Sequence, residues 1–223
     1  MHKRLGMERV VIVQPSVYGT DNSCTVDAVL RLGKRARAVV VIDGDVKATP
    51  GVCGVRVNLH TGGVHDAATA QRQLQEAAAR VAPLGWHVQT FTSLALLRDM
   101  RPLNVPLVID HFGLPRDAAD VEYLAQLLRT SDVYVKLSGT HRLPMDPGPA
   151  VRALVAAAPD RCLWGSDWPH PTSGKRDARE IQPFDEIDDA ASLRRLHQWV
   201  GDEALFRKIL VDNPARLYDF QAS

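Results

Sequence analysis

The chain has 223 residues, which suits one domain with a sizeable core and is too short for two ordinary α/β domains. Its 27 Lys and Arg nearly cancel its 26 Asp and Glu, and the resulting net charge of +1 argues against partners such as nucleic acid or an anionic membrane. Three scattered cysteines without a CxxC pair, and an early apolar run (Val10–Val13) too short for a signal peptide or membrane span, predict a soluble cytoplasmic protein.

Short β-branched runs alternate with longer amphipathic runs along the chain. The former predict strands and the latter predict helices. The predicted strands are Val10–Gln14, Ala38–Ile42, Gly54–Asn58, His87–Thr90, Leu107–Asp110, Val133–Leu137 and Cys162–Gly165. The predicted helices are Thr25–Arg35, Ala67–Val81, Leu94–Met100, Val121–Leu128 and Ala150–Ala158, followed after a polar loop over 169–189 by a mostly helical tail over Ser192–Tyr218, broken at Asn213–Pro214.

This alternation predicts parallel β–α units, which occur both in closed barrels and in open doubly wound sheets. The segment after the first strand, from Gln14 to Gly19, has no resemblance to the GxGxxG phosphate loop of many open sheets. We therefore predict an α/β fold of the (β/α)8 TIM-barrel type. Only seven strands are found where a closed barrel has eight, so we expect the first strand of the barrel to be lacking. The amino-acid composition does not change markedly along the chain, so no domain boundary is indicated and we predict one domain over residues 1–223.

The strand ends carry many polar side chains, and in α/β barrels the chemistry lies where strands end and loops begin. Single residues of this kind are often turn or cap residues, which is the default interpretation of Ser16 and Asn58. Lys136 lies inside a strand and, if it points into the barrel, needs a carboxylate partner. The polar residues at the strand ends include Gln14, Ser16, Tyr18, Arg56, Asn58, His60, Gln89, Thr90, Asp110, His111, Ser138, His141, Arg142, Ser166, Asp167 and His170.

Asp167 is the sharpest candidate, because it directly follows an apolar strand and is flanked by Trp164, Trp168 and Pro169. Partial desolvation among aromatic side chains would raise its proton affinity and suit it to general-base work on water. The alternative interpretation is an Asx-turn or a helix cap before the proline. The sequence alone leaves both interpretations open, and we predict the catalytic one.

His111 and two arginines are the natural helpers of such a base. An imidazole at a strand end can bind a metal, orient a carbonyl or stabilise an oxyanion, or it can simply be hydrogen-bonded in the wall. Arg56 and Arg142 can bind an anionic substrate group with two donors, or form structural salt bridges. Neither a GxSxG nucleophile motif nor an HExxH zinc motif is present.

Several motifs in the right order give the chain a family resemblance. The segment Trp164-Gly165-Ser166-Asp167-Trp168-Pro169-His170-Pro171 resembles the last-strand signature of the amidohydrolase-related (amidohydrolase 2) family. The matches span nearly the whole chain, and the closest branch is that of 2-pyrone-4,6-dicarboxylate lactonase and related lactone hydrolases. The other matching segments are Val13–Ser16 with Tyr18–Asn22, Gly54–Asn58, Asp110–Gly113, Val135–Gly139 and Asn213–Tyr218.

The resemblance implies hydrolysis of a lactone or related cyclic ester of a small organic acid. Asp167 would activate the attacking water and His111 would polarise the carbonyl. The substrate-binding residues would be Ser16, Tyr18, Arg56, Arg142 and His170. Some members of the branch need no metal and others bind a divalent ion such as Zn or Mn, for which His111 and Asp167 are the candidate ligands.

Two departures from the family pattern affect these expectations. The family's first strand, with a His-x-His pair, is missing, and residues 1–8 resemble the end of the helix after it. Unpaired strand edges would favour association, so a homo-oligomer is one expectation. Arginines are absent from Leu59–Gly63 and from Leu114, where the pyrone dicarboxylate enzymes suggest more, so we expect a less anionic substrate. The rival functions are a metal-dependent decarboxylase and a truncated, non-catalytic binding barrel.

Overall fold

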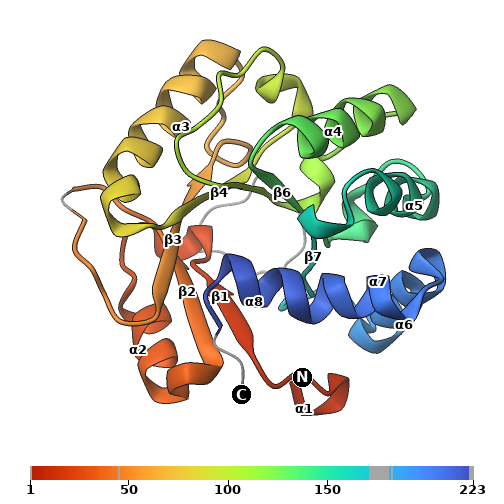
Figure 1. The fold of residues 1–223 in the computed structure, drawn as a ribbon. Helices are drawn as coiled ribbons and strands as arrows, with labels where there is room; N and C mark the ends of the chain where they lie inside the picture. Colours follow the sequence, from red (N-terminus) through yellow and green to blue (C-terminus); the bar gives the residue numbers. More distant parts are fainter. Residues whose placement is uncertain (1, 45, 171–180, 182, 221–223) are drawn as a thin grey trace.

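Seven parallel strands form one curled sheet in sequence order, from β1 to β7 (Figure 1). The computed structural model describes residues 2–44, 46–170, 181 and 183–220. In this part of the chain, β1 and β7 are the two ends of the sheet, and the predicted TIM-barrel-type α/β fold is confirmed. The strands are β1 (Val10–Val13), β2 (Ala36–Val40), β3 (Val52–Asn58), β4 (His87–Phe91), β5 (Leu107–Ile109), β6 (Val133–Leu137) and β7 (Cys162–Trp164).

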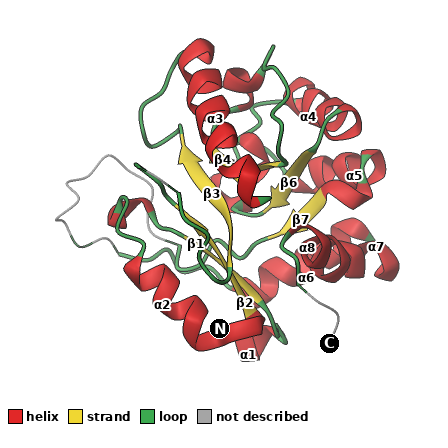
Figure 2. Ribbon diagram, turned by 60° about the vertical axis from the view of Figure 1, so that its left-hand side comes forward, coloured by secondary structure: helices red, strands yellow, loops and turns green. Residues whose placement is uncertain are grey.

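Helices lie around the outside of the sheet (Figure 2). α3 illustrates the reason, because Leu74, Ala78 and Val81 lie on one face of the helix and are fully buried in the core. Aspartates cap α3 and α4 by accepting backbone N–H groups. The helices are α1 (His2–Leu5), α2 (Ser23–Leu32), α3 (Ala67–Val81), α4 (Ala118–Thr130), α5 (Pro147–Ala157), α6 (Asp189–Val200), α7 (Glu203–Arg207) and α8 (Asn213–Leu217).

Two predicted helical segments differ from the structure. The predicted helix Leu94–Met100 is only a 3-10 turn over Leu94–Leu97, whose buried leucines anchor a connection that becomes extended at Arg98. The tail breaks at Gly201 rather than at Asn213–Pro214, since Gly201 adopts a left-handed conformation that ends α6. Pro214 instead lies in the first turn of α8, which follows directly on a π-helical turn over Lys208–Asp212. The predicted polar loop falls largely on residues 171–180 and 182, outside the described residues.

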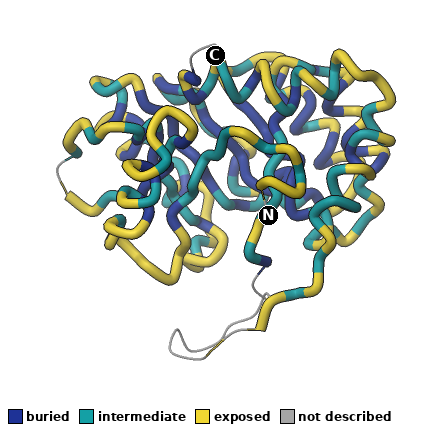
Figure 3. Tube along the Cα trace, turned by 90° about the horizontal axis from the view of Figure 1, so that it is seen from below, coloured by how far each residue is buried: buried dark blue, intermediate teal, exposed yellow. Residues whose placement is uncertain are grey.

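The amino ends of the strands are closed by apolar packing. Val108, Tyr134 and Leu163 form a cluster with Tyr218 and Phe220 from the C-terminal segment. This segment is fixed by Arg37, whose Nε donates a hydrogen bond to the Tyr218 carbonyl oxygen at 3.0 Å. The buried strands occupy the centre of the molecule and the exposed segments its periphery (Figure 3). The polar inner side chains therefore gather toward the carboxyl ends of the strands.

Within the described residues, no helix has both the length and the apolar character that crossing a membrane requires.

Candidate active site

Asp110 is the centre of a buried polar layer inside the curled sheet. Gln89 Nε2 donates to both of its carboxylate oxygens, at 3.0 and 2.9 Å. Lys136 Nζ lies 3.2 Å from Oδ1, so the predicted carboxylate partner of this interior lysine is found. Arg56 Nε lies 3.9 Å from Oδ2. Burial by itself would raise the pKa of the Asp110 carboxyl, but the nearby cations, Lys136 foremost, outweigh it and hold the pKa below its ordinary value.

His111 follows this layer at the end of β5. Its Nδ1 lies 3.0 Å from the Ser138 hydroxyl, which comes from the end of β6. Its Nε2 lies 3.5 Å from Asp167 Oδ1. Burial lowers the pKa of His111, although Asp110 and Asp167 oppose the shift, so the neutral imidazole dominates at neutral pH.

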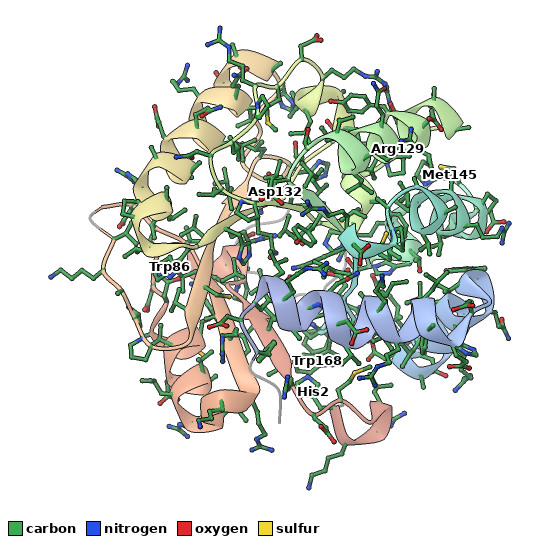
Figure 4. The ribbon with its side chains drawn as sticks, in the orientation of Figure 1. His2, Trp86, Arg129, Asp132, Met145 and Trp168 are labelled. Atoms are coloured by element: carbon green, nitrogen blue, oxygen red, sulfur yellow. The ribbon has the colours of Figure 1, made fainter. Side chains whose placement is uncertain are left out.

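Asp167 lies beyond β7 with its side chain 15% exposed. Arg142 Nε donates a hydrogen bond to its Oδ2 at 2.8 Å, and His141 Nε2 lies 3.7 Å from the same oxygen. Trp168, labelled in Figure 4, was expected to shield this carboxylate, but it is itself largely exposed, at 62%. The carboxylate is instead framed by a guanidinium and two imidazoles, which the separate turns after β5 and β6 supply.

The predicted substrate-binding residues divide into two groups. Arg142 contacts Asp167 directly. Ser16 and Arg56 lie together on the other side, where the Ser16 hydroxyl accepts from Arg56 Nη1 at 2.8 Å and from Asn58 Nδ2 at 2.6 Å. Arg56 faces Asp110, the chain neighbour of His111, and this connects the two groups. Tyr18 lies apart from both networks in a short turn after β1 and is 49% exposed.

His170 lies next to Asp167 and is almost completely buried, with its side chain 4% exposed. Its Nε2 is held by Asp189 Oδ1 at 2.9 Å, at the start of α6. Its backbone N–H donates to the Asp167 carbonyl oxygen at 3.1 Å, which joins the two residues in one turn. His170 is therefore positioned by a carboxylate from the next helix, as well as by its neighbours in sequence.

His141, Asp167 and His170 form a group that could hold a metal ion. Each offers one ligand atom, and these atoms all lie within 4.8 Å of one another. Two imidazoles and a carboxylate suit Zn²⁺ and related divalent ions. The ring nitrogen of His170 that Asp189 does not hold is buried and makes no hydrogen bond within the described residues, as a vacant ligand atom would. The geometry thus groups Asp167 with His141 and His170 as a set of three possible ligands, and His111 Nε2 lies beside the same carboxylate, 3.5 Å from Oδ1.

Several residues of the site were not assigned a role from the sequence. His141, Ser138, Asp110 and Gln89 were recognised only as polar residues at strand ends. Asp189 gave no indication of pairing with His170, because it fell at the end of the predicted polar loop over 169–189, where an exposed aspartate is ordinary. Their roles depend on which loops meet above the sheet.

Comparisons with known proteins agree with this architecture. The profile of the amidohydrolase family matches residues 1–220. A 4-sulfomuconolactone hydrolase of Hydrogenophaga intermedia is 35% identical over 235 residues, which cover 96% of this chain and 75% of that protein. A 2-pyrone-4,6-dicarboxylate hydrolase of Comamonas testosteroni is 31% identical over 249 residues, which cover 98% of this chain and 78% of that protein.

Solved structures share the fold over the whole chain. A Pseudomonas putida protein provisionally named 2-pyrone-4,6-dicarboxylic acid hydrolase superposes with a TM-score of 0.78 at 29% identity, covering 100% of this chain and 88% of that one. An apo structure from Agrobacterium tumefaciens gives a TM-score of 0.77 at 26% identity, with 100% and 84% covered. The family resemblance expected from the sequence motifs is confirmed, and the chain belongs to the amidohydrolase family.

Proposed function

We propose that this protein hydrolyses a lactone of a small organic acid. The observation that carries the proposal is the position of the Asp167 carboxylate, 2.8 Å from Arg142 Nε and 3.5 Å from His111 Nε2 at the carboxyl end of the sheet. A base beside an imidazole donor can serve both the water and the carbonyl of an ester. The lactone hydrolases among the relatives support the same reaction class.

In the proposed reaction, a water oxygen attacks the lactone carbonyl carbon while its proton passes to Asp167. His111, in the tautomer that carries its proton on Nε2, donates to the carbonyl oxygen as negative charge develops. Ser138 holds that tautomer by donating its hydroxyl proton to Nδ1, 3.0 Å away. The ring C–O bond then breaks, and the departing alkoxide takes the proton from Asp167. Lactone and water thus give one hydroxy acid.

We propose an anionic substrate with fewer charges than a dicarboxylate. Arg142 already pairs with Asp167, and Arg56 lies toward Ser16 and Asp110. Two guanidinium groups that already pair with protein carboxylates can still bind one anionic group of a substrate. They leave little uncompensated positive charge for a second anionic group. Tyr18, which is 49% exposed, would complete the pocket from the rim, and the buried His170 would contribute to its wall. The small-molecule substrate is the only ligand that the proposed reaction needs besides water.

A divalent ion such as Zn or Mn is proposed as an optional cofactor, held by His141, Asp167 and His170. When bound, such an ion supplies Lewis-acid polarisation of an oxygen or a more acidic water. The protein residues keep the tasks of placing the carbonyl and moving the proton.

Replacing Asp167 with Asn tests the proposal directly. The variant keeps the shape of the side chain but loses the base, so we expect kcat on an active lactone to fall about 10³-fold. Turnover is measured across a panel of anionic lactones, with and without a chelator, and circular dichroism reports the fold. Asp27→Asn, in an exposed ion pair on α2, should retain wild-type rates.

Three outcomes would contradict the proposal. Full activity of Asp167→Asn would remove the assigned base. Release of CO2 from a carboxylated substrate, with every lactone inert, would identify the metal-dependent decarboxylase. Binding of small acids without any turnover would identify a non-catalytic barrel.

A further inference from the structure

We infer that His141, Asp167 and His170 form a divalent-metal site in which the ion competes with Arg142 for the Asp167 carboxylate. The inference concerns the same site as the proposed function and deepens it, but its measurement is metal affinity and not lactone turnover.

The buried imidazole of His170 is the first observation behind this assignment. Its side chain is only 4% exposed, yet Nδ1 makes no hydrogen bond within the described residues. A buried nitrogen without a partner costs free energy unless a ligand completes it. Asp189 holds the opposite nitrogen at 2.9 Å, which is the arrangement that orients metal-binding histidines in proteins. Nδ1 is therefore the nitrogen of His170 that is left for an ion.

The spacing of the three ligand atoms is the second observation. One ring nitrogen of each histidine and one Asp167 carboxylate oxygen all lie within 4.8 Å of one another, and His141 Nε2 is 3.7 Å from Asp167 Oδ2. Ligands of a tetrahedral Zn²⁺ at about 2.1 Å stand roughly 3.4 Å apart. The two imidazoles and the carboxylate need to approach by up to about 1.4 Å, from 4.8 Å to about 3.4 Å, to reach that spacing. Side-chain rotation within the existing turns can supply such a change.

The charge of the adjoining cavity is the third observation. A cavity of about 570 Å³ borders His170, and its lining includes the ligand-orienting Asp189. Its charged lining residues are mostly acidic, which raises the local concentration of cations and gives an ion a route to His170. These residues are Arg4, Asp185, Glu186, Asp188 and Asp189.

Arg142 opposes the ion. Its Nε donates to Asp167 Oδ2 at 2.8 Å, which is the same oxygen that faces His141. A guanidinium and a divalent ion cannot both occupy this oxygen without strong repulsion between like charges. Binding of the ion at Oδ2 is therefore opposed by Arg142, and a neutral side chain at position 142 should strengthen binding. The chain thus holds the carboxylate in one of two states, paired with arginine or bound to metal.

Calorimetric titration of the chelator-treated full chain with ZnCl2 tests the inference. We expect one Zn²⁺ per chain, and Arg142→Gln should bind it at least about 10-fold more tightly. His170→Gln or His141→Gln should abolish this binding. Asp189→Asn should weaken it about 10- to 100-fold, as the loss of an orienting carboxylate does. Circular dichroism on each variant confirms that the fold is retained.

Two histidine variants serve as matched controls. His111→Gln should keep the Zn²⁺ affinity, since His111 lies outside the group of three. His197→Gln removes a partly exposed imidazole that is paired with Glu203 and lies outside the group of three, and it should also have no effect.

The inference is overturned if wild type and Arg142→Gln both fail to bind Zn²⁺, or if His111→Gln abolishes binding while His141→Gln and His170→Gln do not. Equal affinities of wild type and Arg142→Gln would overturn the competition. Lactone turnover by the metal-free wild type that is lost in Asp167→Asn would sustain the proposed function in each of these cases.

Discussion

Three predicted site residues have an unusual backbone conformation. His111, Asp167 and His170 have φ of 51°, 62° and 59°, in the left-handed region that side chains with a Cβ rarely adopt. Each such residue costs on the order of 1 kcal/mol and persists only where the surroundings hold it. The hydrogen bonds to Ser138 and Asp189 supply part of that restraint. Backbone strain of this kind is common at functional sites, where the turn holds a side chain in a fixed direction.

Gly139 is the residue that lets His111 approach the turn after β6. A Cβ at this position would lie 2.6 Å from His111 Nδ1 and 3.2 Å from Arg142 Cδ, and the backbone φ is +62°. Gly139→Ala should therefore displace the imidazole from Ser138 and lower kcat/KM about 100-fold. Steady-state kinetics on an active lactone measure the effect.

Gly85 provides the matched control for this substitution. It has a similar φ of +67°, but a Cβ there would meet nothing within 4 Å. Gly85→Ala should cost about 1 kcal/mol of stability from the backbone alone and leave kcat/KM unchanged. Equal kinetic losses in the two variants would show that strain, and not the contact with His111, governs the site.

At the scale of secondary-structure elements, the ion pair between β6 and the end of β5 crosses the interior of the sheet. The side chains of Lys136 and Asp110 are 11% and 6% exposed. Removing one partner of a buried pair leaves an uncompensated charge, whereas replacing both is much less costly. This pair joins neighbouring strands below His111, so it couples sheet stability to the site.

Lys136→Met should lower the free energy of unfolding by about 3–5 kcal/mol, because Asp110 loses its nearest cation. The double variant Lys136→Met/Asp110→Asn should recover more than half of that loss. Urea unfolding measures both. Arg31→Met, which breaks an exposed pair with Asp27 of 2.8 Å, should cost less than about 1 kcal/mol. A loss for Lys136→Met as small as that of Arg31→Met would contradict the assigned role.

At the scale of the whole molecule, His87 connects the stability of the sheet to pH. It is 2% exposed on the inner face of β4, and its ring meets Tyr218 edge-on at 5.4 Å between centroids. Burial, followed by the charge of Lys136, lowers the pKa of His87 to about 3. The unfolded chain therefore binds a proton at this residue between about pH 6.5 and 3 that the folded chain does not.

Stability should accordingly fall as the pH decreases below 6.5, by about 2 kcal/mol at pH 5 from His87 alone. His87→Gln should remove this part of the pH dependence. Unfolding free energies at pH 7 and pH 5 give the difference for each protein, so an overall destabilisation of the variant does not obscure it. An unchanged difference in His87→Gln would show that other groups titrate instead.

The sequence by itself determined the alternation of strands and helices, the polar carboxyl ends of the strands and the need of Lys136 for a carboxylate. The strands and helices follow from the local periodicity of apolar residues, and the requirement of Lys136 follows from the free-energy cost of burying an unpaired charge. Both can be recognised in a short stretch of sequence. The break of the tail at Gly201 was not predicted, because a proline is the stronger helix-breaking residue and the break was placed at Asn213–Pro214. Proline is nevertheless tolerated in the first turn of a helix, where Pro214 lies.

Only the tertiary structure decided which loops meet. Arg142 and Asp167 are 25 residues apart, and His170 and Asp189 are 19 residues apart, yet each pair is within hydrogen-bonding distance. No local pattern encodes these pairings, because they depend on how the parallel strands curl and bring their carboxyl ends together. The grouping of Asp167 with His141 and His170, and its competition with Arg142, is a property of that closure.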